Sequence, residues 1–121
     1  MRFLLHIAII LLIISLWQKI SAQTGTHQNN ISEKKADSLA QNERHSEAVE
    51  LYQTLINSGS IKSMEQKNRL IYKTGFSLMH AGKEKQAQTW FLSVLNKSSD
   101  YGLQSDAMAG LGKTYEYTGN R

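Results

Sequence analysis

Hydrophobic and polar positions follow two different patterns along this chain. Residues 3–17 form an almost unbroken apolar run, whereas beyond residue 32 apolar residues recur at intervals of three and four. Such intervals place apolar side chains on one face of an α-helix. They predict helices over about residues 32–42, 46–58, 63–81, 83–96 and 103–118, and no strand. Each predicted helix has one apolar stripe, so each needs a neighbour to pack against.

Short polar motifs predict where these helices begin and end. Ser63 and Gln66 have the spacing of a capping box, in which the Ser63 hydroxyl accepts from the backbone of residue 66. Ser32 is expected to cap the first helix, because serine favours that position. Gly59 and Gly82 are expected to end the second and third helices.

The apolar pattern repeats along the chain. Ala48, Tyr52 and Leu55 recur 39 residues later as Ala87, Phe91 and Val94. Ile71, Gly75 and Leu78 recur 37 residues later as Met108, Gly112 and Tyr115. Small and large residues return in the same order, which is typical of stacked helix pairs and favours binding over catalysis.

On these residues the chain resembles the tetratricopeptide repeat (TPR) family, whose unit is two antiparallel helices. The resemblance covers residues 32–121 and implies an all-α, TPR-like helical-hairpin solenoid of about two and a half repeats. It implies that Gly75 and Gly112, with Ala48 and Ala87, lie where paired helices cross. Tyr52 and Phe91 would fill the space between one unit and the next. The family places no catalytic residue at these positions.

The third unit has Gly112 and Tyr115 but no counterpart of Ala87 and Phe91. We therefore expect Met108, Leu111 and Tyr115 to lie on an uncovered face. This favours the N-terminal piece of a longer protein, truncated in the third repeat. Alternatively, residues 103–118 are themselves a terminal cap.

The N-terminal 22 residues are typical of a secretory signal peptide. Arg2 precedes the apolar run, and Ala22 is a small residue before a polar switch at Gln23. We expect cleavage after Ala22, a flexible lead-in over residues 23–31, and a periplasmic or extracellular protein. The alternative is an uncleaved anchor formed by residues 3–17, although Lys19 interrupts the run before the ~20 apolar residues of a spanning helix. Membrane contact would then occur only through that segment.

Composition narrows the possible chemistry. From Gln23 onward the chain has 12 basic and 10 acidic residues, so nucleic acid is not an expected partner. Cysteine is absent, which excludes disulfides and thiolate metal sites. The four histidines lack metal-ligand spacing. Gly112-Lys113-Thr114 lacks the other features of a phosphate-binding loop. We predict no enzymatic activity, no cofactor and no metal.

The TPR resemblance also implies a binding surface, because the first helix of each unit lines the concave groove in that family. The corresponding residues are Arg69, Tyr72, Lys73, Phe76 and His80 in the second unit, and Asp106, Lys113, Glu116 and Tyr117 in the third. Aromatic and cationic residues together favour a peptide partner of some acidic character. The alternative is an ordinary solvated face. Glu33 and Asp37 hold the places of the Lys and Asn with which some family members clamp a C-terminal carboxylate, so we do not expect that mode.

Two functions follow as hypotheses from these observations. The first is an exported scaffold that binds another protein or peptide and has no catalysis of its own. The alternative is the N-terminal sensory region of a larger membrane signalling protein, with a kinase or transcriptional-regulator output.

Overall fold

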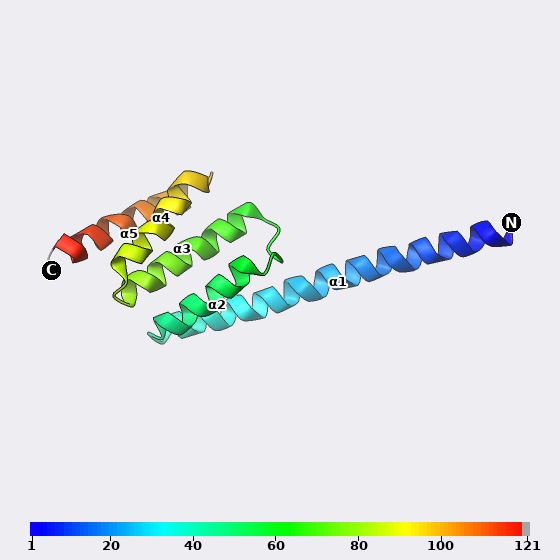
Figure 1. The fold of residues 1–121 in the computed structure, drawn as a ribbon, viewed down its shortest axis with the longest axis horizontal. Helices are drawn as coiled ribbons and strands as arrows, with labels where there is room; N and C mark the ends of the chain where they lie inside the picture. The colour runs from blue at the N-terminus through cyan, green and yellow to red at the C-terminus, as the bar shows by residue number, and fades with distance from the viewer. Residues whose placement is uncertain (120–121) are drawn as a thin grey trace.

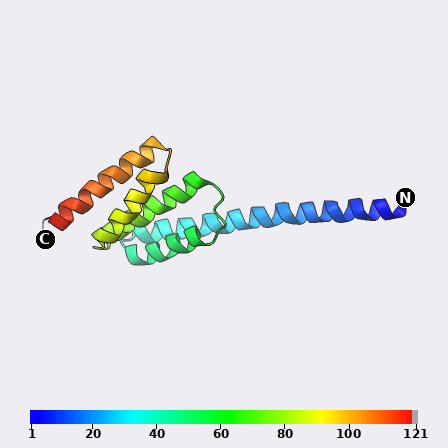
Figure 2. The same cartoon turned by 45° about the horizontal axis from the view of Figure 1, so that its top comes forward.

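The computed structural model describes residues 1–119, and within them the chain forms five α-helices and no strand. The helices are α1 (Arg2–Gln41), α2 (His45–Asn57), α3 (Met64–His80), α4 (Glu84–Lys97) and α5 (Tyr101–Gly119). The predicted all-helical class is confirmed. Consecutive helices run antiparallel and pack side by side, and α5 also contacts α3 (Figures 1 and 2).

The first helix differs from the prediction. Residues 23–31, expected to be a flexible lead-in, are helical and join the apolar N-terminal segment to the packed part of α1 without a break. Ser32 therefore lies inside a helix and caps nothing. Asn29 already belongs to the folded body, because its Oδ1 accepts a hydrogen bond from the Ser60 hydroxyl at 2.9 Å. Figure 1 shows the N-terminal half of α1 projecting away from the other helices.

By length and composition, α1 is apolar and long enough to cross a membrane. In the most apolar stretch of 18 residues in α1, no residue is buried against the rest of the chain. Both a signal peptide near the N-terminus and a membrane anchor have these properties.

Predicted helix ends are largely confirmed. The Ser63 hydroxyl accepts from the Gln66 backbone N–H at 3.2 Å, which caps α3. Gly59 and Gly82 follow α2 and α3 with φ of 69° and 76°, a left-handed conformation that glycine adopts without steric cost. The turn after α1 uses Glu43 instead, with φ of 60°. Glu43 lies 39 residues before Gly82, which is the repeat distance, so the two residues hold equivalent places. A residue with a Cβ is strained in this left-handed conformation, whereas glycine is not.

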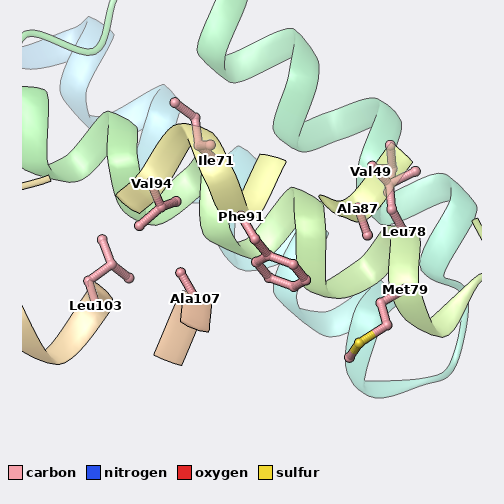
Figure 3. Packing of buried hydrophobic residues seen from close by; sticks show 9 residues of the cluster. All are labelled: Val49, Ile71, Leu78, Met79, Ala87, Phe91, Val94, Leu103 and Ala107. Atoms are coloured by element: carbon pink, nitrogen blue, oxygen red, sulfur yellow. The ribbon is translucent and has the colours of Figure 1, made fainter. Parts of the chain in front are cut away.

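The core consists of two adjoining clusters. One lies between α1, α2 and α3 and contains Ala36, Ala48, Tyr52, Leu55 and Leu70. The other joins α2, α3, α4 and α5 around the fully buried ring of Phe91 (Figure 3). Its members are Val49, Ile71, Leu78, Met79, Ala87, Phe91, Val94, Leu103 and Ala107.

The expected close approaches are confirmed at Gly75 and shifted in α5. A Cβ at Gly75 would lie 3.1 Å from Cβ of Trp90 and from Cε1 of Phe91, so α3 and α4 do cross closely there. Gly112 was expected at the same kind of crossing, and that was wrong: apart from the neighbouring backbone of α5 itself, no described atom lies within 4 Å of its Cβ position. In α5 the close approach is at Gly110, whose Cβ would lie 2.6 Å from Cζ of Phe91.

The expected uncovered face of α5 is confirmed for Met108 and Tyr115, which are 62% and 56% exposed. It was wrong for Leu111, which is half-buried and packs against the cluster around Phe91. Gly112 is also exposed on this helix. The side of α5 that packs on α3 and α4 carries Leu103, Ala107, Gly110 and Thr114.

Candidate functional site

A row of rings runs along α3 and ends on α2. Tyr72, Phe76 and His80 are spaced by four residues, so they lie on one face of the helix. The ring centroids of Tyr72 and Phe76 are 6.2 Å apart, and those of Phe76 and His80 are 4.4 Å apart. His45 of α2 stacks on His80 at 5.2 Å. We call these four residues the aromatic row.

A cavity of about 220 Å³ opens beside the aromatic row. Its walls come from α1, α2 and α3, namely Ala40, Tyr52, Tyr72, Lys73, Phe76 and Ser77. Three of these residues are aromatic, so the walls are largely apolar. Ser77 is 1% exposed, and its Oγ has no hydrogen-bond partner among the described residues. We call this space the three-helix cavity.

A charged cluster borders the three-helix cavity. Lys73 Nζ donates to Glu33 Oε1 at 2.8 Å and to both carboxylate oxygens of Asp37 at 2.9 and 3.0 Å. The Tyr52 hydroxyl also donates to Asp37, at 2.6 Å. Burial alone would lower the pKa of Lys73, but the hydrogen bonds from the two carboxylates outweigh it and raise that pKa. Lys73 is therefore charged and bound at neutral pH.

The same surroundings affect Tyr52. Burial is the main cause that raises the pKa of the Tyr52 phenol, and its hydrogen bond to Asp37 raises it further. The phenol therefore stays protonated and keeps donating to Asp37. This fixes the Tyr52 ring, which is 2% exposed, as part of the cavity wall.

Helix α5 adds charges along the other side of the aromatic row. Burial raises the pKa of Tyr72, and the nearby carboxylate of Asp106 raises it further. Burial lowers the pKa of His80, and the positive charges of His45 and Lys113 lower it further. Asp106 and Lys113 thus lie near opposite ends of the row, one of each sign.

The predicted site residues do not all gather in one place. Tyr72, Lys73 and Phe76 line the three-helix cavity, and His80 continues the aromatic row. The others are exposed and outside the cavity lining: Arg69 on α3, and Asp106, Lys113, Glu116 and Tyr117 on α5. The expectation of an acidic partner counted Lys73 among several cationic residues, with Arg69 and Lys113. The ion pairs with Glu33 and Asp37 neutralise Lys73 and so weaken that basis at the three-helix cavity.

Several wall residues were not among the predicted site residues. Tyr52 had been assigned only to packing between units, and Ala40, Ser77 and His45 had no assigned role. Glu33 and Asp37 are four residues apart and therefore share a face of α1, which is the one signal in the sequence that these carboxylates act together.

Other features offer less for binding or chemistry. A broader hollow of about 420 Å³ lies at the turn between α3 and α4, lined by residues 82–86 and Thr118, without an aromatic side chain. Within residues 1–119, no group of three or more His, Cys, Asp or Glu side chains lies close enough to hold a metal ion.

Comparison with models of known protein families, with curated proteins and with solved structures finds no match for this chain.

Proposed function

We propose that this protein is an exported scaffold of the tetratricopeptide type that binds a peptide segment of another protein and carries out no catalysis. The observation that supports this best is the three-helix cavity beside the aromatic row, because its walls come from three separate helices. Aromatic side chains that converge on a hollow are the usual anchoring points of a peptide interface.

The peptide would bind mainly along the aromatic row, beside the three-helix cavity. Phe76 is 39% exposed although its ring contacts both Tyr72 and His80, so part of a large apolar surface remains free for a ligand. Rings of this kind lose little conformational entropy on binding, because their positions are already fixed by their neighbours. The pattern of contacts favours an extended or helical segment laid along α3.

A display library of random peptides, panned over the immobilised full chain in detergent micelles, tests this proposal. We expect selected peptides to bind the wild type and to lose at least about tenfold in affinity on Phe76→Ala, since anchoring residues cost more than ~1 kcal/mol when truncated. Leu92→Ala is the matched control, because Leu92 is 43% exposed on α4 and does not line the three-helix cavity. Peptides equally sensitive to both substitutions, or no selected peptide at all, would contradict the proposal.

Export is part of the same proposal. Cleavage after Ala22 would leave residues 23–41 as the first helix, and this piece keeps Asn29, Glu33, Ala36 and Asp37 and their contacts. Sequencing the N-terminus of the exported protein should find Gln23. An intact Met1 on the exported protein would contradict cleavage and support the anchor formed by residues 3–17.

A sensory region of a larger membrane signalling protein is the second candidate. The observation that favours it is the continuity of α1 between its apolar segment and the wall of the groove. Reading the gene beyond Arg121 separates the two functions. A further hydrophobic span followed by a kinase or regulator domain would support the sensor.

A further inference from the structure

We infer that the three-helix cavity takes a basic side chain, best an arginine, of the bound peptide. This inference rests on the proposed peptide-binding function and adds the chemistry of the anchor residue. It reverses the acidic preference that the sequence alone favours.

The first support is the balance of charge beside the cavity. Glu33 and Asp37 supply two carboxylates, whereas Lys73 supplies one ammonium, so the cluster keeps one excess negative charge at neutral pH. Glu33 uses only its Oε1 for Lys73. Within the described residues, Arg69 forms no ion pair, and Arg44 is paired with Glu47 instead. An arriving cation is thus attracted, and an arriving carboxylate is repelled.

The second support is aromatic. Lys73 Nζ lies 6.0 Å from the centroid of the Tyr52 ring, so a cation already sits near the face of one cavity wall. Tyr72 and Phe76 supply two further rings to the same walls. The faces of aromatic rings attract cations, and a guanidinium also stacks flat against them. A cavity with the accessible rings of Tyr72 and Phe76 and an acidic border is therefore suited to arginine.

The third support is the Ser77 hydroxyl. Ser77 lines the cavity, its side chain is almost fully buried, and its Oγ has no hydrogen-bond partner among the described residues. A buried polar group without a partner is costly, and a ligand that pairs with it recovers that cost. The guanidinium of arginine has five N–H donors and no acceptor, so a donor of this kind suits the Ser77 oxygen.

The test uses peptides selected from the display library on the immobilised full chain. We expect them to share an arginine, or less often a lysine, at one position. Replacing that arginine by citrulline, its neutral analogue, should weaken binding about tenfold, because charge-assisted hydrogen bonds are about twice as strong as neutral ones. In the Glu33→Gln protein the difference between the two peptides should shrink, whereas Glu50→Gln, an exposed carboxylate on α2, should leave it unchanged.

The outcomes separate this inference from the proposed function. Peptides that need Phe76 but bind equally with arginine or citrulline, or that carry an acidic residue at the shared position, overturn the basic anchor and leave the peptide-binding function standing. If no selected peptide depends on Phe76, both the basic anchor and the peptide-binding function are contradicted. The citrulline comparison changes only the peptide, so it remains decisive if Glu33→Gln lowers the stability of the protein.

Discussion

Two glycines of α5 offer a sharp test of the packing, because the same substitution should have opposite effects only two residues apart. A Cβ at Gly110 would lie 2.6, 2.8 and 2.9 Å from three ring carbons of Phe91, far inside the ~3.5–4.0 Å of normal carbon contact. A Cβ at Gly112 would meet no described atom within 4 Å. We therefore expect Gly110→Ala to destabilise the fold and Gly112→Ala to stabilise it.

The magnitudes follow from two opposing effects. Alanine is favoured over glycine inside a helix by ~1 kcal/mol, and this gain applies to both sites. At Gly110 overpacking costs ~1–3 kcal/mol, because the Phe91 ring is fully buried and cannot withdraw while it also contacts Gly75. The net result is a loss of ~1 kcal/mol for Gly110→Ala and a gain of up to ~1 kcal/mol for Gly112→Ala. The difference of ~2 kcal/mol is independent of helix propensity.

Thermal unfolding of the full chain in detergent micelles, followed by circular dichroism at the helix band, measures this difference. For a domain of this size, ~1 kcal/mol corresponds to about 4–8 °C in Tm, so the two variants should differ by about 10 °C. Combining Gly110→Ala with Phe91→Leu provides the control. Removing the ring should remove most of the penalty at Gly110, so the two substitutions should not be additive.

Equal Tm values for the two variants would refute the reasoning, as would a larger loss for Gly112→Ala than for Gly110→Ala. Full additivity of Gly110→Ala and Phe91→Leu would show that the penalty at Gly110 does not come from the ring.

Four further outcomes are expected from the same unfolding assay. Gly75→Leu should cost ~3 kcal/mol by overpacking, and unchanged stability would mean that α3 and α4 do not cross there. Tyr52→Phe should cost ~1.5 kcal/mol by removing the 2.6 Å hydrogen bond to Asp37, and a neutral effect would show that this bond contributes little. Glu43→Gly should stabilise by ~1 kcal/mol, because φ is 60° at this residue, and a loss would contradict strain in this turn. Because the pKa of His80 is lowered in the folded state, its neutral form favours folding, and stability should fall as pH drops below the ordinary value of 6.5. His80→Gln should reduce that fall, and an unchanged pH dependence would count against it.

Most of the helical architecture could be predicted from spacing alone, because α2 to α5 each carry one apolar stripe. The exception is the region 23–31, where polar residues show no helical period. The sequence there also contains no proline, and once both flanking segments are helical, continuing the helix costs less than interrupting and restarting it. The contact between Asn29 and Ser60 then holds the end of this region against the body, and no local pattern reveals it.

The position of the close contact in α5 is a second feature that the sequence does not predict. Aligning the repeat placed Gly112 opposite Gly75, but of these two only Gly75 lies at a close approach to another helix. Gly110 faces the preceding unit, and its counterpart in α3 is Lys73, which passes along the Tyr52 ring. Because lysine and glycine do not resemble each other, the repeat pattern could not identify Gly110 as the residue that accommodates Phe91.

The candidate site could be predicted only where it depends on one helix. The four-residue spacing of Tyr72, Phe76 and His80 is visible in the sequence. The ion pairs of Lys73 with Glu33 and Asp37 join residues 40 and 36 positions apart and depend on how α1 and α3 are aligned across the body. That alignment determines whether Lys73 is free, and it changes the charge expected of a partner.

The unbroken course of α1 has a mechanical consequence. In a chain that keeps its N-terminal segment, the carboxylates of Glu33 and Asp37 lie on the same continuous helix as the apolar residues, about 20 and 25 Å along the axis from Ile20 at ~1.5 Å per residue. A continuous helix without a hinge transmits a rotation about its axis from one end to the other. Rotating the whole helix about its axis by ~100°, the angle between successive residues, would move both carboxylates away from the Lys73 ammonium and Ala40 away from the wall of the three-helix cavity. Cleavage after Ala22 would disconnect the three-helix cavity from any such rotation of the N-terminal segment.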